Sequence, residues 1–353
     1  MPILRWIPIL ACTLALAQDV PFAEEARAPW VPAWELTART ESIRGIFGDG
    51  LVPLGDIRRE GVQVRLRWYA EWGGLDWTAG LRSAVGSDGN SNNRPRWDQQ
   101  PSNGTQLDVA RVELAGVTER LFGKAALGFQ ELGLIASQAM WDPDLRFLGA
   151  GASGGIRGGL VQEASMRTAL GRVRTVYPRN DVDLAAFQAV LKLGLGAFSG
   201  TFHADRWNLA WDEDEGRFNA PDFRGRGRQR LSLDGVGAAA KWEGPVPLEV
   251  RWNGNRERST RDTSEEFQVL AGSRSRPFRP QVSYTWQRLS STGELYVLNS
   301  DQWWYYRGAR GPRAELVLPL RGLWSVSLVH LRQSIRRSPK VAEKTIFTVL
   351  KRF

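Results

Sequence analysis

Segments in which apolar and polar side chains alternate are the feature that most constrains this chain. The clearest is 62–71, where Val62, Val64, Leu66, Trp68 and Ala70 alternate with Gln63, Arg65, Arg67, Tyr69 and Glu71. Side chains two apart share one face of a β-strand, so this segment has one apolar face and one polar face. Alternation resumes after Gly73-Gly74, which predicts a tight hairpin.

The same alternation recurs along the chain, at 187–197, 236–242 and 246–252 among others. Counting such segments gives about 16 strands between Trp34 and Phe353, each of about ten residues. Phase slips at Ala110–Arg111 and Gln130–Glu131 predict β-bulges. The glycine-rich stretch 138–165 is either a strand pair or a long loop, so 14 strands is the alternative.

The connections between these segments alternate in length. The short ones are expected at Gly73-Gly74, 119–123, Ser199-Gly200, 243–245, 277–280 and 319–322. The long polar ones are expected at 87–104, 212–229 and 290–312. Bacterial transmembrane barrels have short periplasmic turns and longer outer loops. The predicted fold is therefore an all-β, antiparallel, up-and-down transmembrane barrel.

The first residues have the features of an export signal. A basic start at Arg5 precedes an apolar run, and Ala15-Leu16-Ala17 matches the small-x-small cleavage pattern. We expect a signal peptide at 1–17, a short periplasmic segment at 18–33 and the barrel at 34–353. Alternatives are a lipoprotein signal ending at Cys12 and a buried N-terminal strand or helix. Cleavage after Ala17 would remove the one cysteine and with it any thiol chemistry.

The chain is basic, with a net charge of +9 and a mean hydropathy of -0.34. In a cytosolic protein this charge would suggest nucleic-acid binding. The export signal and the spread of charge argue against it, and Gly225-Arg226-Gly227-Arg228 is read as a basic surface loop. Lipopolysaccharide phosphates and anionic solutes are the expected partners.

Many of the 16 tryptophans lie near the ends of predicted strands. Trp68, Trp77, Trp242, Trp252 and Trp324 are expected in aromatic girdles at the membrane interfaces, with Trp72, Trp207, Trp211 and Trp286 in similar positions. Two alternatives stay open, namely the aromatic core of a soluble β-sandwich and stacking platforms for sugars.

The opposite faces of the strands carry charge. The expected pore-lining residues are Arg65, Arg67, Arg82, Arg111, Lys192, Arg251, Glu71, Glu113 and Glu249, with Asp76 beside them. In a soluble sheet the same face would simply be solvated. In a barrel it would line the lumen, and its small excess of cations predicts a weak preference for anions.

No enzyme site, metal site or cofactor is expected. His203 and His330 are far apart, and no sequence element selects a nucleophile beside them. The carboxylates Asp212, Asp214 and Glu215 lie in a predicted polar loop. The spacing Asp88-x-Asn90-x-Asn92 lacks the glycine and glutamate of a calcium loop.

The last residues give the most specific local pattern. Thr345, Phe347, Val349, Lys351 and Phe353 share one strand face, and Phe353 ends the sequence. This resembles the C-terminal assembly signal of bacterial outer-membrane β-barrels, carried here by Phe347, Val349 and Phe353, with Lys351 departing from its apolar pattern. The resemblance is to the class and covers most of the chain. It implies the outer membrane as location, and lipid, lipopolysaccharide and the barrel-assembly machinery as partners.

Together these features predict a porin-like channel for passive diffusion of small hydrophilic solutes. The alternatives are a barrel with an enzymatic or adhesive role and a secreted carbohydrate-binding β-protein. Strand number separates the channel from a barrel with another role, because barrels of about eight strands are filled by their own side chains. Loops such as 138–165 could fold inward and narrow or block the passage.

Overall fold

A computed structural model describes residues 32–47, 53–88, 96–97, 100–101, 104–143, 145–174, 181–213, 227–290, 308–335 and 341–353. The expected signal peptide and nearly all of the segment 18–33 lie outside these ranges. So do Asn90 and Asn92, Asp214 and Glu215, and Gly225-Arg226.

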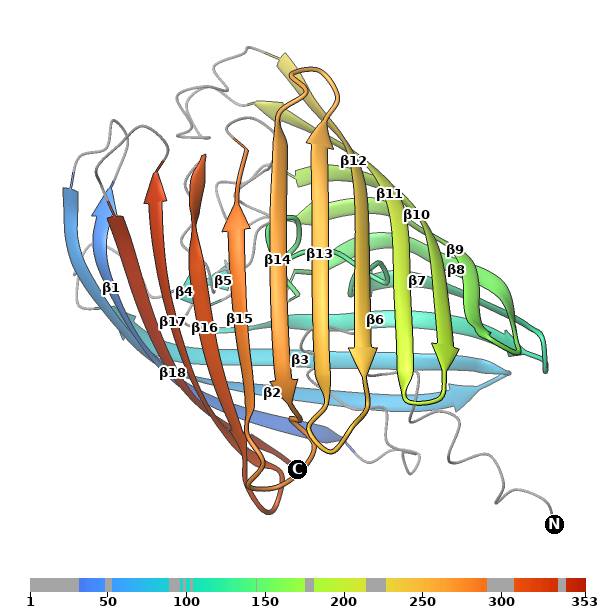
Figure 1. The fold of residues 1–353 in the computed structure, drawn as a ribbon, viewed down its shortest axis with the longest axis horizontal. Coiled ribbons are helices and arrows are strands. Elements are labelled where there is room, and N and C mark those ends of the chain that lie inside the picture. The colour runs from blue at the N-terminus through green and yellow to red at the C-terminus, as the bar shows by residue number, and fades with distance from the viewer. Residues whose placement is uncertain are drawn as a thin grey trace.

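Sixteen strands of the described chain form one closed antiparallel barrel (Figure 1). They are β1 (Ala33–Phe47), β2 (Pro53–Trp72), β3 (Leu75–Asp88), β6 (Gly104–Val117), β7 (Leu121–Gln130), β8 (Phe147–Gly158), β9 (Val161–Arg174), β10 (Asp181–Leu195), β11 (Phe198–Glu213), β12 (Gly227–Trp242), β13 (Leu248–Glu257), β14 (Thr263–Gly272), β15 (Gln281–Arg288), β16 (Ala309–Pro319), β17 (Trp324–Ile335) and β18 (Val341–Arg352). Each strand pairs with its neighbours in the sequence, except that a small separate sheet of β4 (Arg96–Trp97) and β5 (Gln100–Pro101) intervenes between β3 and β6. The predicted up-and-down barrel is confirmed, with 16 strands and not 14.

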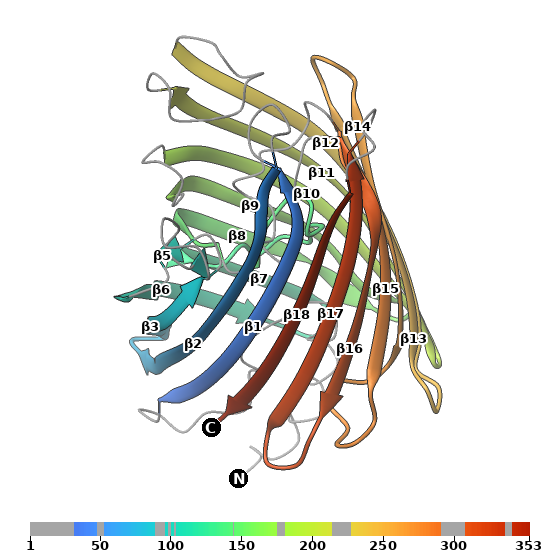
Figure 2. The ribbon, with the colours of Figure 1, turned by 90° about the vertical axis from the view of Figure 1, so that its left-hand side faces the viewer.

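The barrel closes where its first and last strands meet. β1 and β18 pair from Glu35–Arg352 to Arg44–Glu343, and lie side by side in Figure 2. The Phe353 N–H donates to the Trp34 carbonyl at 3.0 Å. Closure leaves no unpaired strand edge, as a structure surrounded by lipid requires. The first and last strands are therefore joined by a continuous antiparallel ladder.

One end of the barrel carries the short turns, at 73–74, 118–120, 159–160, 196–197, 243–247, 273–280 and 320–323, and we call it the short-turn end. Gly73 and Gly74 both have positive φ, +64° and +75°, as the predicted tight hairpin requires. The turn expected at Ser199-Gly200 was placed wrongly, because those residues belong to β11. Gly196, with φ +59°, makes the turn instead.

The glycine-rich stretch 138–165 resolves into the end of a loop, all of β8 and the start of β9. Glycines on the inner face of β8 hide its alternation from the sequence. A Cβ at Gly149 would come within 2.1 Å of the Leu170 carbonyl oxygen on β9, so the close approach of these strands requires glycine. Of the two predicted bulges, the first is misplaced: the shift falls at Asp108, opposite Gly80 and Leu81. The second, at Gln130–Glu131, is where β7 ends.

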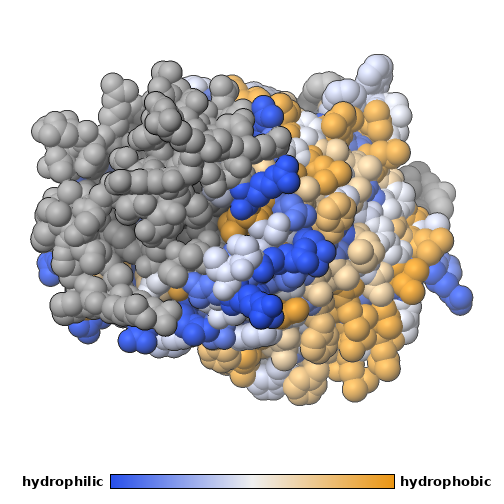
Figure 3. Space-filling view, turned by 90° about the horizontal axis from the view of Figure 1, so that it is seen from above, coloured by the Kyte–Doolittle hydropathy of each residue, from blue (hydrophilic) through white to orange (hydrophobic). Residues whose placement is uncertain are grey.

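Apolar side chains lie on the outside of the wall and charged side chains on the inside, which is the reverse of the arrangement in a soluble protein. Large apolar side chains such as Val62, Phe187 and Leu328 are 46–47% exposed on the outside. Figure 3 shows hydrophobic residues over the part of the outer wall that is in view at the right. Charged side chains such as Arg65 are buried on the inside. An apolar exterior and a polar interior are typical of a barrel that crosses a membrane. No helix in the described ranges is long and apolar enough to do so.

Candidate functional site in the barrel interior

A loop between β7 and β8 lies inside the barrel. We call residues 131–146 the inner loop. Its Met140, Trp141 and Leu145 are at most 4% exposed and pack on an apolar patch of the inner wall. The Trp141 and Trp207 ring centroids are 6.3 Å apart. The patch consists of Phe147, Ala169, Val173, Val182, Leu184, Ala186, Trp207, Leu209, Trp211, Leu231 and Leu233, from β8 to β12. Apolar contact therefore holds the loop within the interior.

Polar contacts attach the same loop to β9 and β10. The Gln188 side-chain oxygen accepts from the Ile135 N–H at 2.9 Å, and its Nε2 donates to the Ile135 carbonyl at 2.7 Å. Arg167 donates to the Gly133 carbonyl at 3.4 Å. These bonds satisfy backbone groups that the loop would otherwise bury without partners.

The inner loop also reaches a distant part of the wall. Ala139 forms a buried apolar contact group with Leu289, next to the end of β15, and Ala309, at the start of β16. The loop begins at β7 and is seated on β8–β12, so it extends across the interior. It narrows whatever passage the barrel contains.

Arginines gather where the inner loop meets β2, β3 and β6. Arg67 donates to Asp108 at 2.7 Å and to Glu131 at 2.6 Å. Arg146, from the end of the loop, lies 3.2 Å from both carboxylates. Arg82 Nε is 3.9 Å from Asp108. We call Arg65, Arg67, Arg82, Arg111 and Arg146 the arginine cluster.

The cluster controls the charge state of Glu131 in the inner loop. Burial by itself raises the pKa of a carboxyl group, but the guanidinium groups of Arg146 and Arg67 outweigh it. They hold the pKa of Glu131 at about 2, below its usual 4.5. Glu131 is therefore ionised at neutral pH and can keep its two ion pairs.

Most of the residues expected to line a pore are on the inner face. Arg65, Arg67 and Arg82 are 3–5% exposed, and Arg111 lies 3.7 Å from Glu113. Lys124 adds a 2.8 Å ion pair to Glu113. Glu71 differs, since it is exposed at the short-turn end, opposite Asp76 in the hairpin.

The remaining expected lining residues lie on other strands and are also ion-paired. Lys192 on β10 is 2.6 Å from Glu163 on β9. Arg251 on β13 pairs with Glu249 and lies 3.5 Å from Gln268 on β14. Paired charges are held in place, so the inner wall presents a fixed pattern of charge.

Sequence reasoning missed Asp108, Glu131, Arg146 and Gln188. Asp108 was hidden by the bulge, and Glu131 and Arg146 lie in a loop without alternation. In the sequence, only the opposite charges of Glu131 and Arg146, at the two ends of the loop, indicate their contact, and the indication is weak.

The two histidines lie on opposite faces of the wall. His203 faces inward, with Nδ1 2.9 Å from Asp205 and Nε2 3.1 Å from Asn253. His330 is exposed on the outside and contacts the Thr345 hydroxyl at 3.0 Å. They cannot form one site. Across the described ranges, no group of three His, Cys, Asp or Glu side chains is placed to hold a metal ion.

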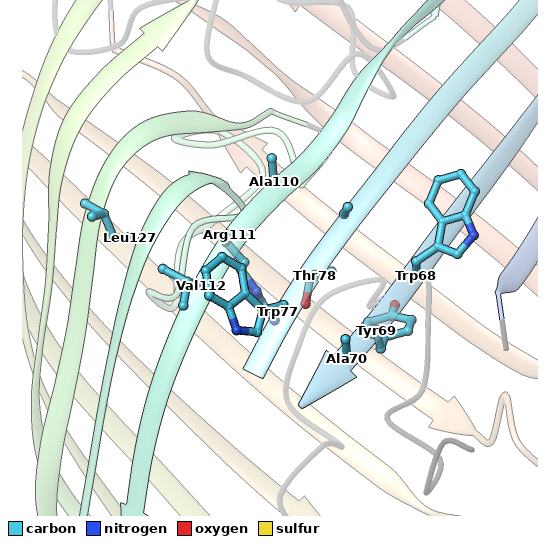
Figure 4. Close-up of a pocket in the computed structure, with 10 residues that line it drawn as sticks. Trp68, Tyr69, Ala70, Trp77, Thr78, Ala110, Arg111, Val112 and Leu127 are labelled. Carbon is cyan, nitrogen blue, oxygen red and sulfur yellow. The ribbon is translucent and has the colours of Figure 1, made fainter. Parts of the chain in front are cut away.

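The tryptophans divide between the two faces. Trp68, Trp77, Trp242, Trp252 and Trp324 are 36–41% exposed on the outer wall, as a girdle requires. Trp207 and Trp211 were assigned there wrongly, because they are 1% and 3% exposed under the inner loop. A groove of about 420 Å³ runs beside Trp68 and Trp77 over β2, β3, β6 and β7 (Figure 4). Its Trp68, Trp77 and Leu127 are exposed on the outer wall, so it is a groove of the outer surface.

Comparison with known proteins rests on the fold. No family model and no curated protein matches the sequence. Among solved structures, Pseudomonas putida OprB is similar with a TM-score of 0.61 at 9% identity, over 92% of this chain and 94% of that one. Salmonella typhi OmpF, solved with daunomycin, is similar with a TM-score of 0.50 at 11% identity, over 91% and 97%. The chain therefore has the 16-stranded fold of porin-like outer-membrane barrels.

Proposed function

We propose that this protein is an outer-membrane channel through which small hydrophilic solutes diffuse. The observation that carries the proposal is the closed 16-stranded barrel with an apolar outside and a charged inside. Barrel diameter grows with strand number, and 16 strands leave an aqueous lumen where eight would be filled. The inner loop occupies part of that lumen and narrows it.

The arginine cluster supports a preference for anions where the inner loop narrows the lumen. Its five guanidinium groups gather around two carboxylates, Asp108 and Glu131, with Glu35 and Glu113 at its margins. Arginine is charged at all physiological pH values. A low-dielectric wall focuses the field of such an excess into the lumen. Arg65, Arg67, Arg82 and Arg111 would then act on passing solutes through this field.

Planar-bilayer recording under a salt gradient tests the proposal. We expect stepwise conductance and a reversal potential that favours anions. Arg65→Gln with Arg82→Gln should shift the reversal potential towards cations. Arg332→Gln, an exposed residue of the outer wall, is the matched control and should leave it unchanged. Absence of conductance from folded protein would refute the channel, and cation preference in the unmodified protein would refute the selectivity.

The export and assembly of the chain belong to the same proposal. Residues 1–17 would act as a cleaved signal, and the outward face of β18 would be read by the barrel-assembly machinery. Lys351 departs from the apolar pattern of that face, and its contacts support a position of this end of β18 at the membrane interface. Its ammonium group lies 5.3 Å from the Trp324 ring and 5.1 Å from the Phe353 ring, and donates to the Gly322 carbonyl. A lysine at the short-turn end can reach headgroups and water from there.

A further inference from the structure

A row of polar residues crosses the inner face of the barrel from β11 to β15. In order along the row, each directly opposite the next, its members are His203, Gly237, Asn253, Glu266 and Gln287. A Cβ at Gly237 would come within 2.1 Å of His203 Nε2 and 2.5 Å of Asn253 Oδ1. The glycine on β12 therefore lets His203 and Asn253 meet across the strand that separates them.

Hydrogen bonds along this row fix which atom of the Asn253 amide faces His203. Gln287 donates to the buried Glu266 at 2.8 Å, and the Asn253 side chain also hydrogen-bonds this carboxylate. An ionised carboxylate only accepts, so the Asn253 nitrogen faces Glu266. The Asn253 oxygen lies 3.1 Å from His203 Nε2 and can only accept. Nε2 must therefore carry a proton.

The other ring nitrogen of His203 also faces an acceptor. Nδ1 lies 2.9 Å from Asp205 Oδ2, and the two side chains are 7% and 4% exposed. Hydrogen bonding on both sides of the ring requires a proton on both nitrogens. The contacts of His203 thus fit an imidazolium cation, and a neutral ring would set a lone pair against an oxygen.

The charged groups around the ring favour its cationic form. Asp205 on the same strand and Glu266 on β14 are the carboxylates of this group. The cations on the inner faces of the adjoining strands, Lys192 on β10 and Arg251 on β13, each have a carboxylate partner. The other residues that face the ring do not titrate: Gln188, Val190, Gly237 and Asn253. The inner loop reaches this group through the backbone of Ile135.

His203 lies beside the amide that holds the inner loop. Gln188 Nε2 donates to the Ile135 carbonyl and is 3.5 Å from His203 Nδ1 and 3.4 Å from Asp205. While Nδ1 carries a proton, it satisfies Asp205 and cannot accept from Gln188. Loss of that proton makes Nδ1 an acceptor and removes a donor from Asp205. Both would then compete with Ile135 for the Gln188 N–H.

Histidine is the side chain whose charge ordinarily changes between about pH 5 and pH 8. We propose that His203 is a proton-sensitive positioning residue: its imidazolium keeps the inner loop seated, and loss of the proton loosens the loop and widens the passage. The effect on the passage rests on the proposed function. The pKa of Glu131, about 2, is below this pH range, so the ion pairs of Glu131 with the arginine cluster persist throughout it.

Hydrogen exchange of the Ile135 N–H, measured on the full chain in detergent, tests the seating of the loop without requiring conduction. We expect its protection factor to fall about five-fold or more between about pH 5 and pH 8. His203→Gln cannot change charge and should show no such step. The matched control is His330→Gln, which removes the second histidine, on the outer wall, and should keep the full step. Heat-modifiable migration on a gel verifies that each variant is folded.

Nitrogen NMR of the His330→Gln variant, in which His203 is the remaining histidine, measures the charge of the ring directly. Both ring nitrogens should be protonated at about pH 5 and one of them at about pH 8. A ring whose protonation does not change in this range would overturn the proposal. So would an exchange step that persists in His203→Gln or one that His330→Gln abolishes.

Single-channel recording over the same pH range separates this inference from the channel proposal. The unmodified protein and His330→Gln should conduct more, or more noisily, at the alkaline end, and His203→Gln should lack this change. Absence of conductance from folded protein would refute the channel, and the exchange step would still decide whether His203 positions the loop. An exchange step without a change in current would overturn the effect on the passage.

Discussion

Gln188 on β10 pairs with Ile135 of the inner loop through both atoms of its amide, accepting at 2.9 Å and donating at 2.7 Å. The Gln188 amide thus supplies the two backbone hydrogen bonds that a neighbouring strand supplies elsewhere in the wall. The same amide nitrogen lies 3.4 Å from Asp205, which receives the Trp207 N–H at 2.6 Å. Trp207 in turn packs against Trp141 of the loop, so the polar and apolar attachments of the loop are joined.

Replacing Gln188 with alanine should loosen the inner loop. Two hydrogen bonds of about 1 kcal/mol each are lost, and the half-buried Ile135 backbone groups lose their partners. We expect larger or noisier single-channel conductance with the barrel intact. Gln268→Ala is the control, because Gln268 bonds Arg251 and Thr285 and not the loop. Identical traces from both variants would mean that Gln188 does not restrain the loop.

Acid should release the loop through Glu131. Its folded pKa of about 2 is below the unfolded value of 4.5, so its carboxylate stabilises the fold fully above pH 4.5. This contribution declines as pH falls from 4.5 and is gone below 2. Thermal unfolding of the protein in detergent should show this loss of stability. Glu131→Gln should abolish that part of the pH dependence, and an unchanged profile would contradict the role of its ion pairs with Arg67 and Arg146.

Deleting Phe353 should slow assembly in the outer membrane. The deletion removes the N–H bond to Trp34 at the closing seam and the ring beside Lys351. Phe353→Tyr keeps both and should assemble normally. The folded fraction in membranes, measured by heat-modifiable migration over time, checks this. Normal speed and yield for the truncated chain would show that Phe353 is no assembly signal.

Inserting charge into the outer wall should cost far more than removing it from the inner wall. Val64→Arg places a cation towards lipid on β2 and should destabilise the barrel by about 2–4 kcal/mol near mid-membrane. Arg65→Gln keeps a polar side chain inside and should cost much less. Urea unfolding in lipid vesicles measures both. Equal losses of stability in the two variants would contradict the placement of Val64 on the outer face and Arg65 on the inner face.

The sequence predicted the wall of this barrel well and its interior poorly. Val62 and Arg65 differ in hydrophobicity, so period two alone assigned them to opposite faces. Trp207 and Trp211 defeated the same rule, because the inner face of β11 is apolar where the inner loop covers it, while its outer face carries Arg206 and Asn208. Alternation cannot tell a lipid-facing tryptophan from one beneath a loop. The contacts of Arg146 and Glu131 join segments far apart in the sequence, so no local pattern reports them.

The apolar patch under the inner loop limits how this barrel can be redesigned. Shortening the loop is the obvious way to widen the passage. It would, however, leave Trp207, Leu209 and Leu233 facing water and remove the partners of Gln188 and Arg167. The patch and the loop behave as the hydrophobic core of a protein that otherwise keeps its apolar surface for lipid. A wider variant therefore needs polar replacements on β10–β12 together with the truncation.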